Sequence, residues 1–160
     1  MSTCCLLFLT GCGIYKFNDA VIPSNVKTIK INYIDNKARY INPQAAPKFY
    51  DKIQQKIIGS TKITRSTNDD ADYVLSGVIT TYDGTQTVGV SSQQASTNRL
   101  TVTLSMEWRN NVEQKTEKFD VTRSFDYSAN KSFQAAEAEL LDEIVRTLTD
   151  DIFNRMFSNW

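Results

Sequence analysis

The sequence contains no histidine, and its three cysteines, Cys4, Cys5 and Cys12, all lie near the start of the chain. Without histidine, neither a Ser-His-Asp triad nor a Cys-His pair can form, and zinc sites lose a principal ligand. The commonest hydrolase classes are therefore disfavoured. We assign no catalytic residue, no metal site and no dissociable cofactor.

The chain also lacks a net charge and a long apolar run. Lys plus Arg and Asp plus Glu number 18 each, so no net field draws the protein toward nucleic acid or an anionic bilayer. No stretch approaches the roughly 20 apolar residues that a membrane-spanning helix needs. Gly84 and Gly89 lie in a Thr- and Gln-rich stretch without a lysine partner, which does not fit a phosphate-binding loop. We expect no nucleic-acid partner.

Three carboxylates in a turn-forming stretch, Asp69, Asp70 and Asp72, come closest to a cation site. A calcium-binding EF-hand loop needs a central glycine and a distal glutamate. This stretch has neither residue at the required spacing. A solvated turn is the better interpretation.

What the sequence does have near its start is a short apolar run from Leu6 that ends in Leu9-Thr10-Gly11-Cys12, the pattern of a bacterial lipobox. Small residues fit a signal peptidase cleft, and the cysteine thiol then accepts a diacylglyceryl group. We expect residues 1–11 to be a lipoprotein signal peptide and residues 12–160 to form one domain anchored by the lipid on Cys12. The first three residues carry no basic side chain, which leaves open a start further upstream, or an irregular terminus with a chance Gly-Cys pair.

Alternation of apolar and polar residues predicts four main strands and one short strand. They lie at 26–34, 62–65 (the short one), 73–82, 99–108 and about 118–127. In the first strand, Ile29, Ile31 and Tyr33 are expected to share one face. In the last strand, Arg123 interrupts the apolar positions. Residues 83–97 are rich in Gly, Ser, Thr and Gln, which favours a long hairpin loop.

Two segments have helical periodicity. The first, at about 47–58, has Pro47 in its first turn and Gly59 where a left-handed cap would fall. The second follows Ser132, a residue suited to capping a helix N-terminus. One apolar stripe then runs to the end of the chain through Leu141, Ile144, Val145, Leu148, Ile152 and Met156.

One-sided strands and two amphipathic helices predict an α+β fold, a two-layer sandwich with a mostly antiparallel sheet of about four strands and both helices packed on one face. The opposite sheet face would then be polar and uncovered. It is our candidate partner-facing surface, formed by Arg99, Thr101, Thr103, Ser105, Lys118, Asp120 and Thr122. Strands of about ten residues span roughly 33 Å. A narrow two-layer domain of this length could stand in the water-filled lumen of a wide β-barrel. Alternatively, its polar sheet face could simply be exposed to the periplasm.

Four segments of the chain resemble the LptE family of lipopolysaccharide-assembly lipoproteins, in the form typical of the Bacteroidetes. They are Gly11-Cys12-Gly13-Ile14-Tyr15-Lys16-Phe17, the stretch from Ile22-Pro23 through Val26-Lys27-Thr28-Ile29, Asn98-Arg99-Leu100-Thr101-Val102-Thr103, and the ending Asp151-Ile152-Phe153-Asn154-Arg155-Met156-Phe157-Ser158-Asn159-Trp160. The resemblance covers nearly all of the expected mature chain, and the ending is its most specific part.

This resemblance implies an outer-membrane lipoprotein on the periplasmic side that plugs the lumen of the LptD β-barrel translocon. Such a protein helps LptD to assemble and helps to pass lipopolysaccharide to the cell surface. The implied partner is LptD, with lipopolysaccharide as a candidate direct ligand, and the family implies no catalytic residue. The resemblance implies a defined role for Cys12 alone, as the lipidated residue.

Two other classes stay open at this point. One is a periplasmic α/β lipoprotein accessory to another lipid-transport, secretion or cell-wall machine. The other is an enzyme that uses carboxylates alone, such as a glycosidase, which needs two carboxylates facing each other in a cleft. Asp120 and Asp126 are instead expected on a flat sheet face.

Overall fold

The computed structural model describes residues 22–88 and 97–158. Within these ranges the chain forms β1 (Thr28–Asn36), α1 (Ala45–Ser60), β2 (Thr64–Arg65), β3 (Tyr73–Val88), β4 (Thr97–Asn110), β5 (Lys115–Ser128) and α2 (Phe133–Phe157). The predicted α+β class is confirmed. The expected signal peptide, Cys12 and the tip of the expected hairpin loop lie outside the described residues.

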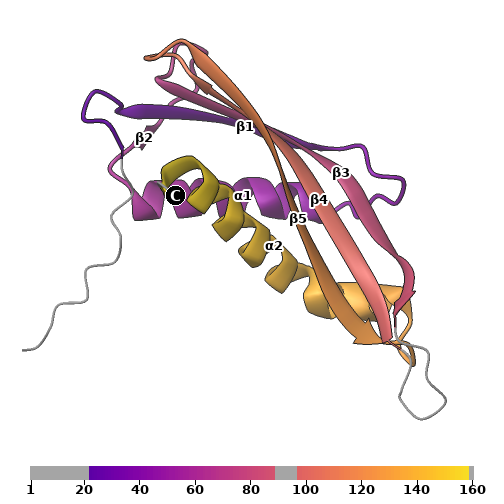
Figure 1. Ribbon diagram of the computed structural model, residues 1–160. Helices are drawn as coiled ribbons and strands as arrows, with labels where there is room; N and C mark the ends of the chain where they lie inside the picture. The colour runs from indigo at the N-terminus through magenta and orange to yellow at the C-terminus, as the bar shows by residue number, and fades with distance from the viewer. Residues whose placement is uncertain (1–21, 89–96, 159–160) are drawn as a thin grey trace, which may run out of the picture.

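The strands form one sheet in the order β2-β1-β3-β4-β5. β3, β4 and β5 pair antiparallel, as predicted, whereas β1 runs parallel to both β2 and β3. The parallel part arises because α1 carries the chain back between β1 and the strands that follow, as a crossover connection requires. Figure 1 shows both helices on the same side of the twisted sheet, which confirms the two-layer prediction.

The core lies between the sheet and the two helices. On β4 the four apolar side chains from Leu100 to Met106 are each at most 2% exposed, and α1 and α2 bury their own apolar stripes against them. The buried helix residues include Phe49, Ile53, Ile57, Ile144, Leu148 and Ile152. Full burial of one such side chain contributes about 1.5 to 3 kcal/mol. The other face of β4 therefore points away from the helices.

Tyr33 does not take the position that strict alternation predicts. The pairing of β1 with β3 shifts between Ile31 and Ile34, so an irregularity moves Ile34 into the buried row at 6% exposure. Tyr33 is 77% exposed, and its ring stacks on Tyr50 of α1 with 4.5 Å between centroids. A β-bulge adds one residue to the strand, and from there on the alternation changes phase.

Two further local predictions are wrong at helix and strand ends. Gly59 lies inside α1, which runs to Ser60, and the hydroxyl of Thr61 donates to the carbonyl of Ile57 at 2.7 Å. That hydrogen bond satisfies a terminal carbonyl, so no left-handed glycine is needed there. The predicted loop 83–97 is also shorter than expected, because β3 continues to Val88.

Side-chain contacts account for the predicted N-cap of α2 and for the charged residue in the apolar row of β5. The hydroxyl of Ser132 accepts from the backbone N–H of Ala135 at 3.2 Å, which confirms it as the N-cap. Arg123, which interrupts the apolar row of β5, donates from Nε and Nη2 to the carboxylate of Asp151 on α2, at 2.6 and 2.7 Å. A charged side chain is thus accommodated on the helix side of the edge strand by pairing with α2.

Candidate docking surface

All seven predicted surface residues lie on the sheet face turned away from the helices. Arg99, Thr101, Thr103 and Ser105 alternate with the buried residues of β4, and Lys118, Asp120 and Thr122 occupy the matching positions of β5. We use the term outer face for the outward residues of these two strands. They are Arg99, Thr101, Thr103, Ser105 and Glu107 on β4 and Lys118, Asp120, Thr122, Ser124 and Asp126 on β5.

Pairs of side chains cross the outer face from β4 to β5. The guanidinium of Arg99 donates twice to the carboxylate of Asp126, at 2.6 and 2.9 Å. Next to this pair, the hydroxyls of Thr101 and Ser124 lie 2.9 Å apart, and those of Thr103 and Thr122 lie 3.0 Å apart. Cross-strand pairs of this kind each contribute roughly 0.2 to 1 kcal/mol. The outer face is therefore an ordered row of paired polar groups.

Four of the five charged side chains of the outer face form ion pairs, Arg99 with Asp126 and Lys118 with Glu107. The ammonium of Lys118 lies 3.0 Å from the carboxylate of Glu107. Hydrogen bonding from Arg99 lowers the pKa of Asp126 below its ordinary value of 3.8, so this carboxylate stays ionised at neutral pH. A partner would meet both signs of charge, which favours specific complementarity over bulk attraction.

The sequence did not reveal how β3 extends this face. In the sheet register, Val78 lies beside Ser105, Thr81 beside Thr103, and Asp83 beside Thr101. The pairing of β3 with β4 shifts between Ile79 and Thr81, which obscures the alternation in the sequence. A hollow of about 430 Å³ on this side of the sheet is lined by Ser76, Gly77, Val78, Ser105, Met106, Glu107, Lys118 and Asp120.

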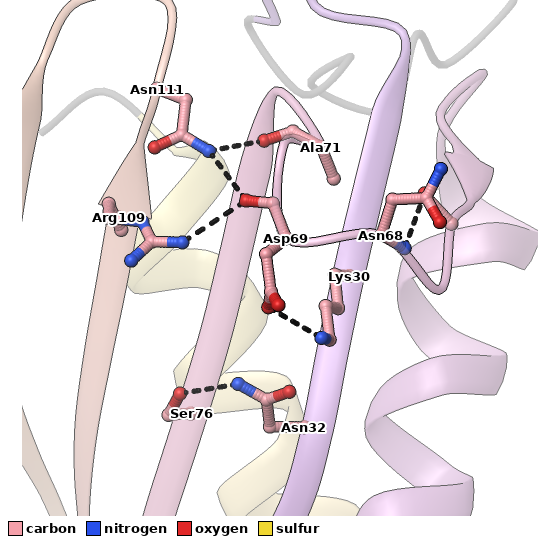
Figure 2. Close-up of polar contacts among 9 residues, drawn as sticks. Lys30, Asn32, Asn68, Asp69, Ala71, Ser76, Arg109 and Asn111 are labelled. Carbon is pink, nitrogen blue, oxygen red and sulfur yellow. Dashed lines mark hydrogen bonds and ion pairs between the residues drawn. The ribbon is translucent and has the colours of Figure 1, made fainter.

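One end of this side of the sheet is occupied by the turn at residues 66–72 (Figure 2). The ammonium of Lys30 lies 2.6 Å from the carboxylate of Asp69, and the backbone oxygen of Asp69 accepts from Arg109 at 3.2 Å. Asn111 donates to the carbonyl of Ala71 at 2.6 Å. Val74 lies on the side of the sheet opposite the core, because its neighbours Tyr73 and Leu75 face the core. The turn held by these contacts explains why Val74 is nevertheless only 5% exposed. The turn thus covers this side of the sheet around Val74, and the accessible polar surface beyond it lies on β4, β5 and the adjoining part of β3.

Two of the three carboxylates in the acidic cluster of that turn, those of Asp69 and Asp72, are engaged by protein groups. Asp69 binds Lys30, and Asp72 accepts hydrogen bonds from the backbone N–H groups of Lys27 and Thr28 at 2.8 and 2.9 Å. The structure therefore supports the interpretation as a turn. Within the described ranges, no group of three or more His, Cys, Asp or Glu side chains could hold a metal ion.

Asp120 and Asp126 do not form a glycosidase pair. They lie six residues apart on one strand, a separation of about 20 Å at about 3.4 Å per residue. Glycosidase carboxylates lie about 5 to 10 Å apart across the scissile bond. Asp126 is in addition bound to Arg99, so these two carboxylates cannot act as facing acid and base.

Two solved structures have a similar fold and place the chain in a class. One is a minor lipoprotein from Acinetobacter baumannii, with 14% identity, a TM-score of 0.54, and coverage of 81% of this chain and 91% of that chain. The other is a PelC dodecamer from Paraburkholderia phytofirmans, with 13% identity, a TM-score of 0.54, and coverage of 88% and 94%. At this level of identity the likeness concerns the fold alone. The class is thus a two-layer α+β domain with a fold that also occurs in a bacterial lipoprotein.

The family is given by the sequence over most of the chain. The model of the family described as LptE, lipopolysaccharide-assembly, matches residues 26–156. The chain belongs to this family, which is non-enzymatic and works with the LptD outer-membrane protein. The match confirms the resemblance to the LptE family and makes the chain an LptE-like lipoprotein of the cell envelope. No curated protein sequence matches the chain significantly. Neither helix of the described ranges is long and apolar enough to cross a membrane.

Proposed function

We propose that this protein is a non-enzymatic outer-membrane lipoprotein that docks inside the lumen of an LptD-type β-barrel, helps the barrel to assemble and supports lipopolysaccharide transport to the cell surface. Membership of the LptE family supports this role. The observation that carries the docking mode is the outer face, where polar groups are paired across β4 and β5. A face of this kind suits a polar, water-filled lumen better than an apolar interface.

The dimensions of the sheet agree with this role. β4 and β5 each contain 14 residues, so each extends about 45 Å. That length is comparable to a bilayer with its headgroup regions, about 40 to 45 Å. The domain could therefore present its outer face along most of a barrel wall.

The docking mode is tested by adding charge to the outer face. Thr101→Asp with Thr103→Asp places two carboxylates in the centre of the row, next to Asp83 in the sheet register. We expect a folded protein that no longer co-isolates with LptD from detergent-solubilised outer membranes. Cells that depend on it should have a leaky outer membrane, because less lipopolysaccharide reaches the surface.

A matched control adds the same charge elsewhere. Gln55 on α1 and Gln134 on α2 are both exposed, so Gln55→Asp with Gln134→Asp should leave LptD recovery unchanged. Thermal melts of both purified variants check that each is folded. Full recovery of LptD with the outer-face variant would exclude this face as the docking surface. Absence of any barrel partner for the parent would favour an accessory lipoprotein of another envelope machine.

We further propose that Cys12 carries the lipid that holds the protein at the membrane. The two acyl chains of a diacylglyceryl group, bound to the cysteine sulfur through a thioether, give stable anchoring. Cys12→Ser should therefore leave the protein unprocessed or release the mature form into the soluble periplasmic fraction, as judged by fractionation and intact mass. Equal amounts of mature, membrane-bound protein in variant and parent would contradict lipidation at this position.

A further inference from the structure

β5 ends the sheet on one side of the described chain (Figure 1). It pairs with β4 along 14 positions, from Lys115 to Ser128, and no other described strand pairs with it. An edge strand presents a row of free backbone N–H and C=O groups, which can pair with a further strand.

The edge is open to approach. A hollow of about 600 Å³ lies between β5 and α2, lined on the strand by Lys118, Phe119, Asp120, Val121 and Arg123 and on the helix by Asp151, Asn154 and Arg155. Two apolar rings of the strand, Phe119 and Phe125, are packed against the core but only partly buried. A further strand could therefore reach the backbone of β5 and cover additional apolar surface.

Arg123 restricts which strand can pair there. An inward-pointing charge on an edge strand is a common protection against indiscriminate pairing. In this protein the charge is held by Asp151 through two hydrogen bonds. A partner strand must leave that ion pair intact and must not place a second cation against Arg123.

We propose that β5 pairs antiparallel with β5 of a second copy of this chain, in the register that places Thr122 opposite Thr122. In this register Lys118 of each copy lies opposite Asp126 of the other, which gives two opposite-charge pairs related by the two-fold axis. Within each chain Lys118 already contacts Glu107 and Asp126 contacts Arg99. The outer faces of both copies would thus form one continuous surface. Across its strands the sign of charge alternates, from Glu107 and Lys118 of one copy to Asp126 and Arg99 of the other.

The same register also matches the helix side of the strand. Phe119 and Phe125 face the core, opposite Met106 and Leu100 of β4. Across the two-fold axis, Phe119 of one copy lies opposite Phe125 of the other, again twice. Aromatic pairs directly opposite each other stabilise neighbouring strands, and both of these rings on β5 are only partly buried in the monomer.

Neighbouring registers lack this complementarity. A two-fold axis at Arg123 would place two guanidinium groups opposite each other and Asp120 opposite Asp126. An axis at Asp120 would place two carboxylates opposite each other, and an axis at Val121 would place Phe119 opposite Arg123. Like charges directly opposite each other destabilise strand pairing, which disfavours the axes at Arg123 and Asp120, and the axis at Val121 lacks the ion pairs and the aromatic pairs that the register centred on Thr122 provides. This inference concerns the edge of the sheet and does not depend on the proposed function.

The first test is a charge exchange, with self-association of the full chain in detergent measured by sedimentation velocity over a range of concentrations. Lys118→Asp alone and Asp126→Lys alone each place like charges opposite each other twice, and each should weaken association about tenfold or more. The double exchange, Lys118→Asp with Asp126→Lys, should restore it to within about threefold of the parent. It leaves the ion pairs to Glu107 and Arg99 broken, so the recovery cannot come from stability within one chain.

Lys48→Asp serves as the matched control, because Lys48 forms an exposed ion pair with Asp142 away from the edge. It should associate like the parent, and thermal melts should show that all variants are folded. Three outcomes would overturn the proposal: a parent that is monomeric at every soluble concentration, single exchanges without effect, or a double exchange that does not recover.

The second test traps the register. In a full chain with Cys4, Cys5 and Cys12 changed to Ser, Thr122→Cys should form a disulfide-linked dimer under mild oxidation, because the two positions are directly opposite. Ser124→Cys, on the same face of the same strand, should stay monomeric, because it lies opposite Asp120. Cross-linking at Ser124 but not at Thr122, or at neither position, would contradict this pairing.

Discussion

At the scale of single residues, Asp72 connects two segments that are distant in the sequence. Its carboxylate accepts from the backbone N–H groups of Lys27 and Thr28 and from the hydroxyl of Thr28 at 2.9 Å. In return, the backbone N–H of Asp72 donates to that hydroxyl at 3.0 Å. The start of β1 is thereby held to the start of β3. The N–H of Lys27, the hydroxyl and the N–H of Thr28 lower the pKa of Asp72 below 3.8, although partial burial opposes the shift.

We expect Asp72→Asn to lower the free energy of unfolding at pH 7 by about 1 to 3 kcal/mol, because hydrogen bonds to an ionised acceptor are lost. A pKa that is lower in the folded than in the unfolded state stabilises the fold above the unfolded value and loses this effect as pH falls through the folded value. The difference between variant and parent should therefore be constant at neutral pH and shrink below about pH 3.8. Urea unfolding across this pH range measures it; a difference that is independent of pH would exclude a role for the ionised carboxylate.

At the scale of elements, β4 shows where an alternating pattern suffices for prediction. Leu100, Val102, Leu104 and Met106 are buried as expected, and the polar residues between them form the outer face. The alternation holds because β4 pairs on both sides with antiparallel strands, and its pairing with β5 runs without interruption. A period of two then determines which side chains face the helices.

This register predicts different costs for neighbouring residues of β4. Leu104 is fully buried, so Leu104→Ala should cost about 2 to 5 kcal/mol through lost burial and a cavity. Thr103 makes a single exposed hydrogen bond to Thr122, so Thr103→Ala should cost under about 1 kcal/mol. Chemical denaturation of both variants provides the comparison. Equal losses would mean that the strand is assigned the wrong face.

Other elements could not be predicted from the pattern, because tertiary contacts determine them. Tyr33 leaves the buried row because β1 contains an irregularity opposite β3, and the sequence offers no turn residue to signal it. Arg123 looks like an error in the apolar row of β5 until Asp151, 28 residues further along, is seen beside it. Gly59 is a residue typical of helix C-caps, but here the hydroxyl of Thr61 supplies the hydrogen bond to the terminal carbonyl of α1 instead.

The candidate surface could likewise be predicted from the sequence only in part. The seven residues predicted for it share one face because strand alternation is a local property. Their partners Glu107, Ser124 and Asp126 depend on the register between β4 and β5. The limit set by the turn at 66–72 depends on contacts from Asp69 to Lys30 and Arg109, over about 40 residues of sequence. Local periodicity cannot reveal such contacts.

At the scale of the whole molecule, the start of α2 joins four parts of the chain. Glu137 is only 6% exposed; its carboxylate accepts from the hydroxyl of Tyr40 at 2.9 Å and from the amide of Asn42 at 2.6 Å. Beside it, the ring of Phe133 packs so closely on β3 that a side chain at Gly84 would overlap it. The hydroxyl of Tyr127 on β5 donates to the carbonyl of Gly84 at 2.8 Å. The β1–α1 connection, β3, β5 and α2 therefore meet in one packed cluster.

We expect Glu137 to contribute to stability as part of this cluster. Glu137→Ala leaves the amide of Asn42 buried without its acceptor, and should cost about 1 to 3 kcal/mol. Tyr40→Phe removes one of the two donors, and should cost about 0.5 to 1.5 kcal/mol. Because the two groups share a hydrogen bond, the double variant should lose less than the sum of the single variants, by about 0.5 to 1.5 kcal/mol.

Glu139→Ala, which breaks only an exposed ion pair with Lys131, is the control and should cost under about 1 kcal/mol. Urea unfolding of the four variants and the parent measures each term, and strict additivity of Glu137→Ala and Tyr40→Phe would show that this hydrogen bond does not hold the connection to α2.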